Sequence, residues 1–276
     1  MELWVVKGIL ERAFHEDMPM GDITTDVTVP ENSESRAVLI AKQEGIIAGL
    51  EVCIEAFKML DPGVKMKSIV NDGDFVEKGS QLLIVEGKSR ALLKAERTAL
   101  NLLQRLSGIA STTRKYVEKI IGYNAKVVDT RKTTPGLRIL EKYAVRVGGG
   151  TNHRFSLSDG VLIKDNHIKA AGGIEQAVNA AKNSIPHTIK IEVETQTLEQ
   201  VKEALSSGAD IIMLDNMSPN LMGQAVKIID GKAKTEASGN ITLDNIQEAA
   251  ASGVDIISVG AITHSINAMD ISMKFE

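Results

Sequence analysis

Two adjacent cations, Arg131 and Lys132, follow a short apolar run at residues 125–128, in the stretch DTRKTTPG. Arginine binds a carboxylate or phosphate through its planar guanidinium group, and lysine supplies a compact point charge. The surrounding segment, residues 126–169, carries nine Lys or Arg and four Asp or Glu, a net charge of +5; the whole chain is at −4, so the rest is at −9. This concentration of positive charge predicts a pocket for a small, multiply anionic substrate.

The apolar run before these cations is the first of six in the second half of the chain. The six runs lie at residues 125–130, 160–165, 188–194, 209–215, 233–238 and 254–260, and most are separated by helical patterns. Alternating strands and helices predict a parallel sheet, and six such units favour a closed or nearly closed β/α barrel. No GxGxxG motif follows the first run, which argues against a dinucleotide-binding sheet. The pattern leaves open whether residues 143–149 form a further short strand.

Each of the six runs ends in residues that can do chemistry. The loops after the strands build the active site of a β/α barrel, so these residues are expected to meet at one face. His153 and Arg154 add positive charge near the predicted mouth. The strand ends carry Arg131 and Lys132, Lys164 and Asp165, Glu192 and Glu194, Asp215 and Asn216, Ser238 and Gly239, and Gly260.

The acidic and glycine-containing ends complement the cations. The carboxylates of Glu194 and Asp215 suit either Mg²⁺, which is held by few protein ligands and several substrate oxygens, or sugar hydroxyls. Gly239 and Gly260 free backbone N–H groups near predicted helix N-termini, an arrangement that binds anions, and barrel phosphate sites often follow the last two strands. A phosphorylated sugar carrying a further anionic group fits this combination.

The first hundred residues have a different pattern. Short β-like runs at residues 36–45, 64–70 and 81–87 are separated by turn signals, and a helical segment at 49–60 lies between the first two. An amphipathic helix is expected near the N-terminus. A long helix is expected from Leu92 to Leu106, continuing after a break at Ser107 and Gly108. These elements predict an α+β module before the barrel.

Composition excludes several classes of function. Aromatic residues make up 3% of the 276 residues, so a stacking platform for nucleic acid is not expected. Cys53 is the single cysteine, which excludes an intrachain disulfide and zinc sites built on cysteine pairs. No apolar run approaches the roughly 20 residues that span a bilayer. The N-terminal segment lacks a secretory or import pattern, so we expect a cytoplasmic protein.

Several motifs resemble those of the quinolinate phosphoribosyltransferase family, also called carboxylating nicotinate-nucleotide pyrophosphorylases. They are TRKTTPGLRILEKYAVRVGGGTNHR, VLIKDNHI, EVE, LDN, ASG and VGAITHS, with EDMPMGDITTD, NDGDFVEKGSQLLIVEG and LLKAERTALNLLQRLSGIAS in the first half. The resemblance covers nearly the whole chain. It implies a pentosyltransferase of NAD synthesis that moves the phosphoribosyl group of phosphoribosyl pyrophosphate to quinolinate. The implied products are nicotinate mononucleotide, pyrophosphate and carbon dioxide, and Mg²⁺ is required.

The resemblance also implies the architecture and the assembly. It predicts an α/β sandwich domain at residues 1–108, joined by the return of about 268–276. It predicts an incomplete parallel β/α barrel of about seven strands at residues 109–267. The family's basic unit is a dimer whose sites lie between subunits, so Arg97 is expected to reach the neighbouring site.

Site residues follow from the same resemblance. Cations would hold the quinolinate carboxylates: Arg97, Arg131, His153, Arg154 and Lys164. Lys132 would face pyrophosphate or a carboxylate, and Thr130 belongs to the same loop. Glu194 and Asp215 would hold ribose hydroxyls, Mg²⁺ or both. The 5′-phosphate would be surrounded by Ser238, Gly239, Gly260 and His264. The implied catalytic residues are Lys132, Lys164, Glu194 and Asp215.

Four alternatives differ from this interpretation. Two keep the fold and change the substrate: a related branch of the family acting on another anion, and nicotinate phosphoribosyltransferase, whose monocarboxylate needs fewer cations. A class I aldolase-like barrel would use Lys164 as a Schiff-base lysine, which requires a depressed pKa. A biotinyl or lipoyl carrier would need its modified lysine in a tight turn, and neither Lys78 nor Lys88 has the expected flanking residues.

Overall fold

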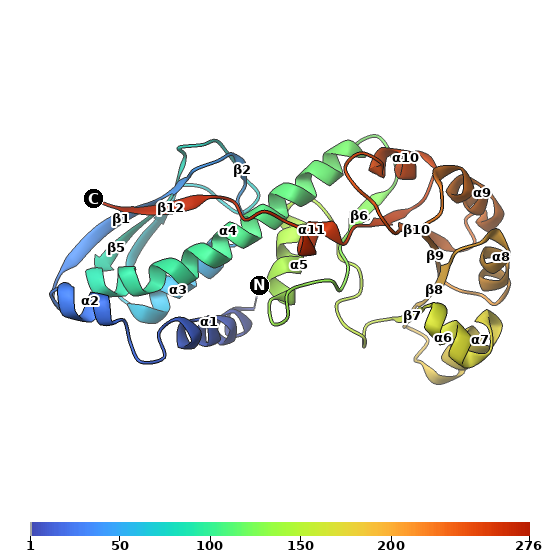
Figure 1. The fold of residues 1–276 in the computed structure, drawn as a ribbon, viewed down its shortest axis with the longest axis horizontal. Helices are drawn as coiled ribbons and strands as arrows, with labels where there is room; N and C mark the ends of the chain where they lie inside the picture. Colours follow the sequence, from blue (N-terminus) through green and yellow to red (C-terminus); the bar gives the residue numbers. More distant parts are fainter. Residues whose placement is uncertain (1) are drawn as a thin grey trace. The chain divides into compact units, whose positions relative to one another are not determined.

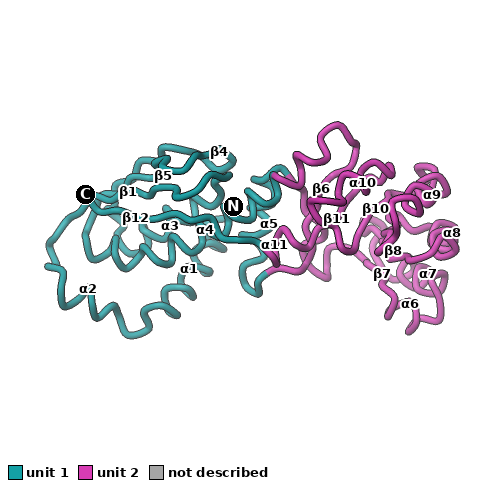
Figure 2. The backbone as a smooth tube through the Cα atoms, turned by 45° about the horizontal axis from the view of Figure 1, so that its top comes forward, with its two compact units in different colours: residues 1–114, 134–149, 266–276 teal, residues 115–133, 150–265 magenta. Residues whose placement is uncertain are grey.

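The computed structural model describes residues 2–276 of the chain (Figure 1). Contacts divide the chain into two compact units (Figure 2). The first unit contains Met1–Arg114, Thr134–Gly149 and Ile266–Glu276, and the second contains Lys115–Thr133 and Gly150–Ser265. Residues 134–149, which the sequence analysis assigned to the barrel, group with the first unit.

The first unit contains a four-stranded antiparallel sheet with the order β12-β1-β5-β3. A separate antiparallel pair joins β2 (Gly45–Ile46) to β4 (Phe75–Val76). The three β-like runs of the first hundred residues are confirmed as strands, and the last strand of the chain completes one edge of this sheet. The four strands are β1 (Glu34–Ala41), β3 (Lys65–Ser68), β5 (Gln81–Lys88) and β12 (Ile271–Phe275).

Helices of the first unit bury apolar faces beside this sheet. One face of α1 buries Val6, Ile9, Leu10 and Phe14, as its amphipathic pattern predicts. Among residues 2–276, no helix has both the length and the apolar character needed to cross a membrane. The helices that lie wholly or largely in this unit are α1 (Leu3–Asp17), α2 (Ile23–Thr28), α3 (Leu50–Leu60), α4 (Ser89–Lys119) and α5 (Arg138–Val147).

The long helix α4 is continuous, so the predicted break at Ser107 and Gly108 is wrong. Both small residues serve contacts inside the first unit. Ser107 Oγ accepts the backbone N–H of Ala48 at 3.1 Å. A Cβ atom at Gly108 would lie 2.2 Å from the carbonyl oxygen of Asn267, so glycine allows another backbone to pass against the helix.

The open question at residues 143–149 is answered by α5, which continues to Val147. Leu140, Ala144 and Val145 are buried at helical spacing, so this segment packs as a helix and not as a strand. Thr151, four residues after α5, makes an isolated parallel bridge to Val128.

The second unit contains a six-stranded parallel sheet with the order β6-β11-β10-β9-β8-β7. All six predicted runs are strands: β6 (Lys126–Val128), β7 (Val161–Ile163), β8 (Ile191–Thr195), β9 (Ile211–Asp215), β10 (Lys234–Ser238) and β11 (Ile256–Ser258). The edge strands β6 and β7 do not pair with each other, so the barrel is incomplete, as predicted. Thr151 occupies the place of a seventh strand.

Helices cover the outer side of this curved sheet (Figure 1). They are α6 (Asp165–Ala171), α7 (Ile174–Ser184), α8 (Leu198–Ser206), α9 (Pro219–Ile229) and α10 (Ile246–Ala251), whereas the short α11 (Ala261–His264) follows the carboxyl end of β11 and is not part of this layer. The fold class is therefore α/β, with a parallel β/α barrel in the second unit and a separate antiparallel sheet in the first. The strands point their carboxyl ends to one face, where the loops gather.

Replacing Gly108 by alanine is expected to lower the free energy of unfolding by about 1 to 3 kcal/mol, because the added Cβ meets the Asn267 backbone. Gly8 is the matched control, since it also lies inside a helix but a Cβ there would be 3.8 Å from its nearest atom, Arg12 Nη1. Gly8→Ala should be neutral or stabilising by up to about 1 kcal/mol. Urea unfolding followed by circular dichroism measures both, and equal effects would contradict the close approach.

Candidate active site

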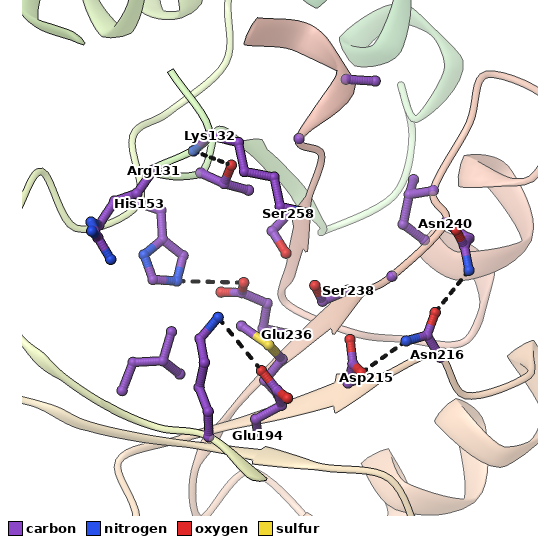
Figure 3. A pocket seen from close by; sticks show the side chains of 18 of the residues that line it. Arg131, Lys132, His153, Glu194, Asp215, Asn216, Glu236, Ser238, Asn240 and Ser258 are labelled. Atoms are coloured by element: carbon purple, nitrogen blue, oxygen red, sulfur yellow. Dashed lines mark hydrogen bonds and ion pairs between the residues drawn. The ribbon is translucent and has the colours of Figure 1, made fainter. Parts of the chain in front are cut away.

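A cavity of about 820 Å³ lies at the carboxyl ends of the strands of the second unit (Figure 3). The site residues implied by the family resemblance line it, except Arg97: Thr130, Arg131, Lys132, His153, Arg154, Lys164, Glu194, Asp215, Ser238, Gly239, Gly260 and His264. Of the other strand-end residues expected at this face, Asn216 lines the cavity, whereas Asp165 and Glu192 do not. Arg97 is exposed on α4, in the first unit. The residues gathered here come from segments as far apart in sequence as Thr130 and His264. These two residues lie close together because β6 and β11, the strands that precede them, are neighbours in the sheet.

The loop after β6 is tied to the loop after β11. The backbone N–H of Lys132 donates to Thr130 Oγ1 at 3.0 Å, and the hydroxyl of Thr263 donates to the carbonyl of Lys132 at 2.8 Å. A Cβ atom at Gly260 would lie 3.2 Å from Lys132 Cδ, so the glycine leaves room for the lysine side chain. These contacts hold the Lys132 backbone beside Gly260 and His264.

A fully buried carboxylate, Asp129, holds the segment that carries His153 and Arg154. Its Oδ1 accepts the backbone N–H of His153 at 3.0 Å, and its Oδ2 accepts the side-chain amide of Asn152 at 2.6 Å. Arg154 Nη1 donates to the carbonyl of Gly160 at 2.9 Å. Burial, and next the positive charge of Arg131, lower the pKa of Arg154, so the pocket concentrates positive charge at a cost in free energy.

The carboxylates of Glu194 and Asp215 lie across the pocket from these cations. Lys164 Nζ is 3.9 Å from Glu194 Oε2. Burial raises the pKa of Glu194, and the neighbouring charge of Asp215 raises it further. Asn216 Nδ2 donates to Asp215 Oδ2 at 2.8 Å. A cation bound between Glu194 and Asp215 would relieve their repulsion, so this pair fits a hard divalent ion such as Mg²⁺.

The turn after β10 depends on glycine. Gly239 has φ +90°, and a Cβ atom there would lie 2.3 Å from Asn216 Oδ1. Asn240 Nδ2 donates to that same oxygen at 3.0 Å. The predicted helix N-terminus beside Gly239 is wrong, because α10 begins only at Ile246. Gly260, in contrast, directly precedes α11.

Some residues at the base of the pocket were not predicted from the sequence. Glu236 lies inside β10 and Ser258 inside β11, and both line the cavity. His153 Nε2 is 3.1 Å from Glu192 Oε2 and 3.5 Å from Glu236 Oε1. The available signal was the two-residue spacing from Glu236 to Ser238, since alternate residues of a strand face the same side. Asn240, Ile241 and Thr242 also line the pocket and were not predicted.

Comparison with known proteins covers both units. The profile of the quinolinate phosphoribosyl transferase C-terminal domain matches residues 109–274, and that of the N-terminal domain matches residues 22–107. A probable carboxylating nicotinate-nucleotide pyrophosphorylase of Bacillus subtilis is 47% identical over 268 residues, which are 97% of this chain and 92% of the relative. A decarboxylating quinolinate phosphoribosyltransferase 1b of Nicotiana tabacum is 41% identical over 290 aligned residues, covering 98% of this chain and 82% of the relative.

A solved structure gives the same result for the fold. The crystal structure of NadC from Streptococcus pyogenes superposes with a TM-score of 0.96 at 42% sequence identity. The alignment covers 99% of this chain and 97% of that one.

Removing the Asp129 carboxylate tests its role as an anchor of this site. Asp129→Ala leaves the His153 N–H and the Asn152 amide without their buried acceptor, so the free energy of unfolding should fall by about 2 to 4 kcal/mol. Asp165→Ala is the control, because that exposed carboxylate makes only a 3.5 Å pair with Lys169 and should change stability by under about 0.5 kcal/mol. Denaturant unfolding measures both. A similar, small effect of the two substitutions would contradict the anchoring role.

Proposed function

Since this chain belongs to the quinolinate phosphoribosyltransferase family, we propose that its pocket residues divide the two substrates of that family's reaction between them. The chain is a phosphoribosyltransferase that acts on quinolinate with decarboxylation, in NAD synthesis. Phosphoribosyl pyrophosphate donates the phosphoribosyl group, and the products are nicotinate mononucleotide, pyrophosphate and carbon dioxide. The observation that carries the residue assignment is the meeting of a cationic wall, an acidic pair and a glycine-containing rim in one cavity.

The cationic wall suits quinolinate, which has two adjacent carboxylates. Arg131, Arg154 and Lys164 face one cavity, where guanidinium and ammonium groups bind carboxylates by charge-assisted hydrogen bonds. We assign these three cations, with His153, to the carboxylates. Arg154 is held by the carbonyl of Gly160, which aims its guanidinium group before substrate arrives.

The remaining groups suit phosphoribosyl pyrophosphate. We assign the ribose hydroxyls to Glu194 and Asp215, and the departing pyrophosphate to Lys132, with Thr130 supporting the Lys132 backbone. The 5′-phosphate is assigned to the rim that contains Ser238, Gly239, Gly260 and His264. Glu194 and Asp215 are also the residues that would hold Mg²⁺, which when bound supplies positive charge to the pyrophosphate oxygens.

The chemistry follows from where charge develops. As the bond from the anomeric carbon to pyrophosphate breaks, positive charge grows on the ribose and negative charge grows on the leaving group near Lys132. The quinolinate nitrogen then forms the new bond to that carbon. The positive charge of the resulting pyridinium nitrogen stabilises the electron pair that stays on the neighbouring ring carbon when its carboxylate departs as carbon dioxide, and that carbon then takes up a proton. Lys164 and Arg154 lie on the wall proposed to face this carboxylate.

A second copy of the chain is proposed to complete the site. The support is that Arg97 is exposed on α4 and lies outside the set of described residues that line the cavity. Apolar side chains are exposed on the same unit: Met20, in the turn before α2, is 92% exposed, and Ile23 and Val27 of α2 are each 77% exposed. Covering such a surface stabilises a dimer. We assign the enzyme to the cytoplasm, in keeping with its similarity to a bacterial relative.

The decisive assay offers quinolinate labelled at its 2-carboxyl group, with phosphoribosyl pyrophosphate and Mg²⁺, and nicotinate in a parallel reaction. Labelled carbon dioxide and nicotinate mononucleotide should appear from quinolinate alone, and omission of Mg²⁺ with added chelator should stop turnover. Arg131→Ala or Lys164→Ala should lower kcat/KM about 100- to 1,000-fold by removing a cation that orients or stabilises charge.

Lys169→Ala is the matched control, since this lysine is 75% exposed and pairs only with Asp165. Folding of each variant is checked by its unfolding curve. Turnover of nicotinate instead of quinolinate would reassign the substrate, and trapping of Lys164 by borohydride would favour the aldolase-like alternative. Near-normal turnover by a folded Arg131→Ala or Lys164→Ala variant would remove that residue from the site.

The shared site is tested by mixing subunits. Arg97→Ala and Arg131→Ala homodimers are each expected to be inactive. A mixed dimer should regain one site, with a theoretical limit of one quarter of wild-type activity after random exchange, because one of its two sites then has both arginines. Activity and subunit exchange are followed together with differently tagged chains. No recovery after proven exchange would show that Arg97 acts in its own subunit.

A further inference from the structure

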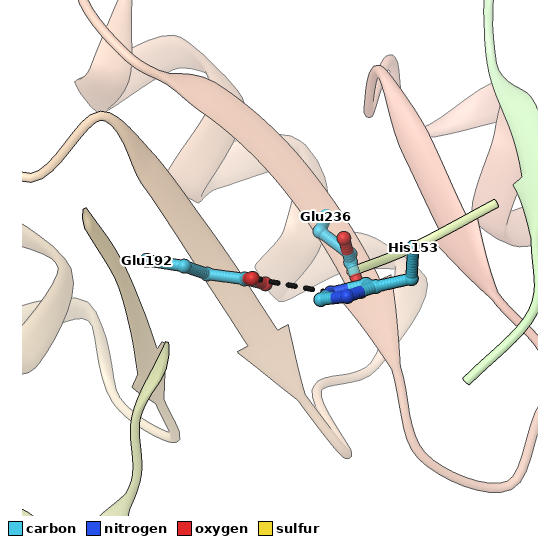
Figure 4. A group of neighbouring side chains, drawn as sticks. All are labelled: His153, Glu192 and Glu236. Carbon is cyan, nitrogen blue, oxygen red and sulfur yellow. Dashed lines mark ion pairs between the residues drawn. The ribbon is translucent and has the colours of Figure 1, made fainter. Parts of the chain in front are cut away.

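Three ionisable side chains meet beneath the pocket: His153, Glu192 and Glu236 (Figure 4). One nitrogen of the imidazole and one oxygen of each carboxylate all lie within 4.8 Å of one another. Glu192 and Glu236 are 4% and 1% exposed. Two glutamates this deeply buried require a compensating charge or a proton.

The imidazole of His153 does not supply that compensating charge. The backbone N–H of Arg154 donates to His153 Nδ1 at 2.7 Å, so Nδ1 presents its lone pair. The ring is then neutral, and its hydrogen is on Nε2, where it points to Glu192 Oε2 at 3.1 Å. Both ring nitrogens are therefore occupied by protein groups, and the orientation of the ring is fixed from two sides.

Each of the two carboxylates has one oxygen without a partner. Glu192 Oε1 and Glu236 Oε1 are buried without a hydrogen-bond partner. A proton on one of the two carboxyl groups supplies a hydrogen-bond donor and removes one buried charge. Burial, followed by the charge of Glu192, raises the pKa of Glu236 to about 8.

We propose that Glu236 is a positioning residue that keeps its proton at neutral pH beside Glu192, so that the two side chains hold the neutral His153 ring under the substrate. The inference rests on the proposed function, since it concerns how the quinolinate site is built. A neutral Glu236 also limits the negative charge of the floor to one, beneath a substrate that brings two carboxylates of its own.

A divalent metal ion in the same cluster is the competing interpretation. A nitrogen and two carboxylate oxygens are a common ligand set for zinc or manganese. A metal on His153 Nε2 would require the ring proton on Nδ1, where the Arg154 N–H donates instead. The geometry therefore favours the proton.

The charged groups around Glu236 come from several elements, and Asp159 and Lys190 line a second cavity of about 260 Å³ that Glu236 also lines. Glu192 faces it from β8 and His153 faces it from the segment after Thr151, while Ser258 of β11 offers a hydroxyl. The strands on either side of β10 contribute Met213 and Ile256 in register with it, and neither residue titrates. The positive charge of Arg154 also interacts with Glu192.

The test compares Glu236→Gln, which keeps the shape of the protonated acid, with Glu236→Ala. Wild-type KM for quinolinate should rise about tenfold per pH unit above the pKa of Glu236, with kcat changed less, because binding requires the protonated form. Glu236→Gln should keep near-normal KM at pH 7 and lose this alkaline rise. Glu236→Ala should raise KM at every pH, since His153 loses its support. Glu118→Gln, an exposed helix position, should match wild type throughout.

Two measurements need no substrate and so separate this proposal from the assignment of quinolinate. Infrared spectra of wild-type protein labelled with carbon-13 glutamate should show a protonated-carboxyl stretch at pH 7 that is lost above about pH 9 and is absent from Glu236→Gln. A pKa raised in the folded state means that the fold gains a proton, so stability falls as pH rises toward 8; the melting temperature of Glu236→Gln should fall less over this range. Absence of that infrared band, an unchanged alkaline rise in Glu236→Gln, or one metal ion per chain that this variant loses would overturn the proposal.

Discussion

One buried carboxylate, Asp129, determines how the cationic side of the pocket is built. It stands at the end of β6 and accepts hydrogen bonds from Asn152 and from the His153 backbone. The chain between them leaves the second unit to form α5 and returns at Gly150. Asp129 thus connects the two points at which the chain leaves and re-enters the second unit. These hydrogen bonds fix the positions of His153 and Arg154.

The pocket balances charges that would be unfavourable alone. Burial and Arg131 lower the pKa of Arg154, whereas burial and Asp215 raise the pKa of Glu194. The two shifts therefore have opposite signs on the cationic and the acidic side of the pocket, and burial is the first cause of both. Burial disfavours the charged form of each group, so a partner of opposite charge on either side would gain free energy by binding there.

Much of this arrangement could be predicted from the sequence because strand ends are marked locally. An apolar run that ends at Arg131, Lys164 or Asp215 predicts both the strand and the functional side chain at its end. Three features could not be predicted from the local sequence in this way. Gly108 resembles a helix break until the approach of Asn267 is known, and Glu141, fully buried and bound by Arg105 at 2.7 Å, resembles a surface residue. Glu236 is a lone acid within a strand, and only the sheet order brings Glu192 near it.

The return of the chain to its first unit sets an order of events during synthesis. β12 pairs with β1 along five residues, Ala37–Ala41, and it is synthesised after the other eleven strands described here. Until residues 271–275 emerge, one edge of β1 has no partner, although every residue of the barrel has already been made. An open strand edge is a template for pairing with other chains. The nascent first unit therefore depends on residues 271–275 for protection, and loss of this strand would expose an aggregation-prone edge far away in the sequence.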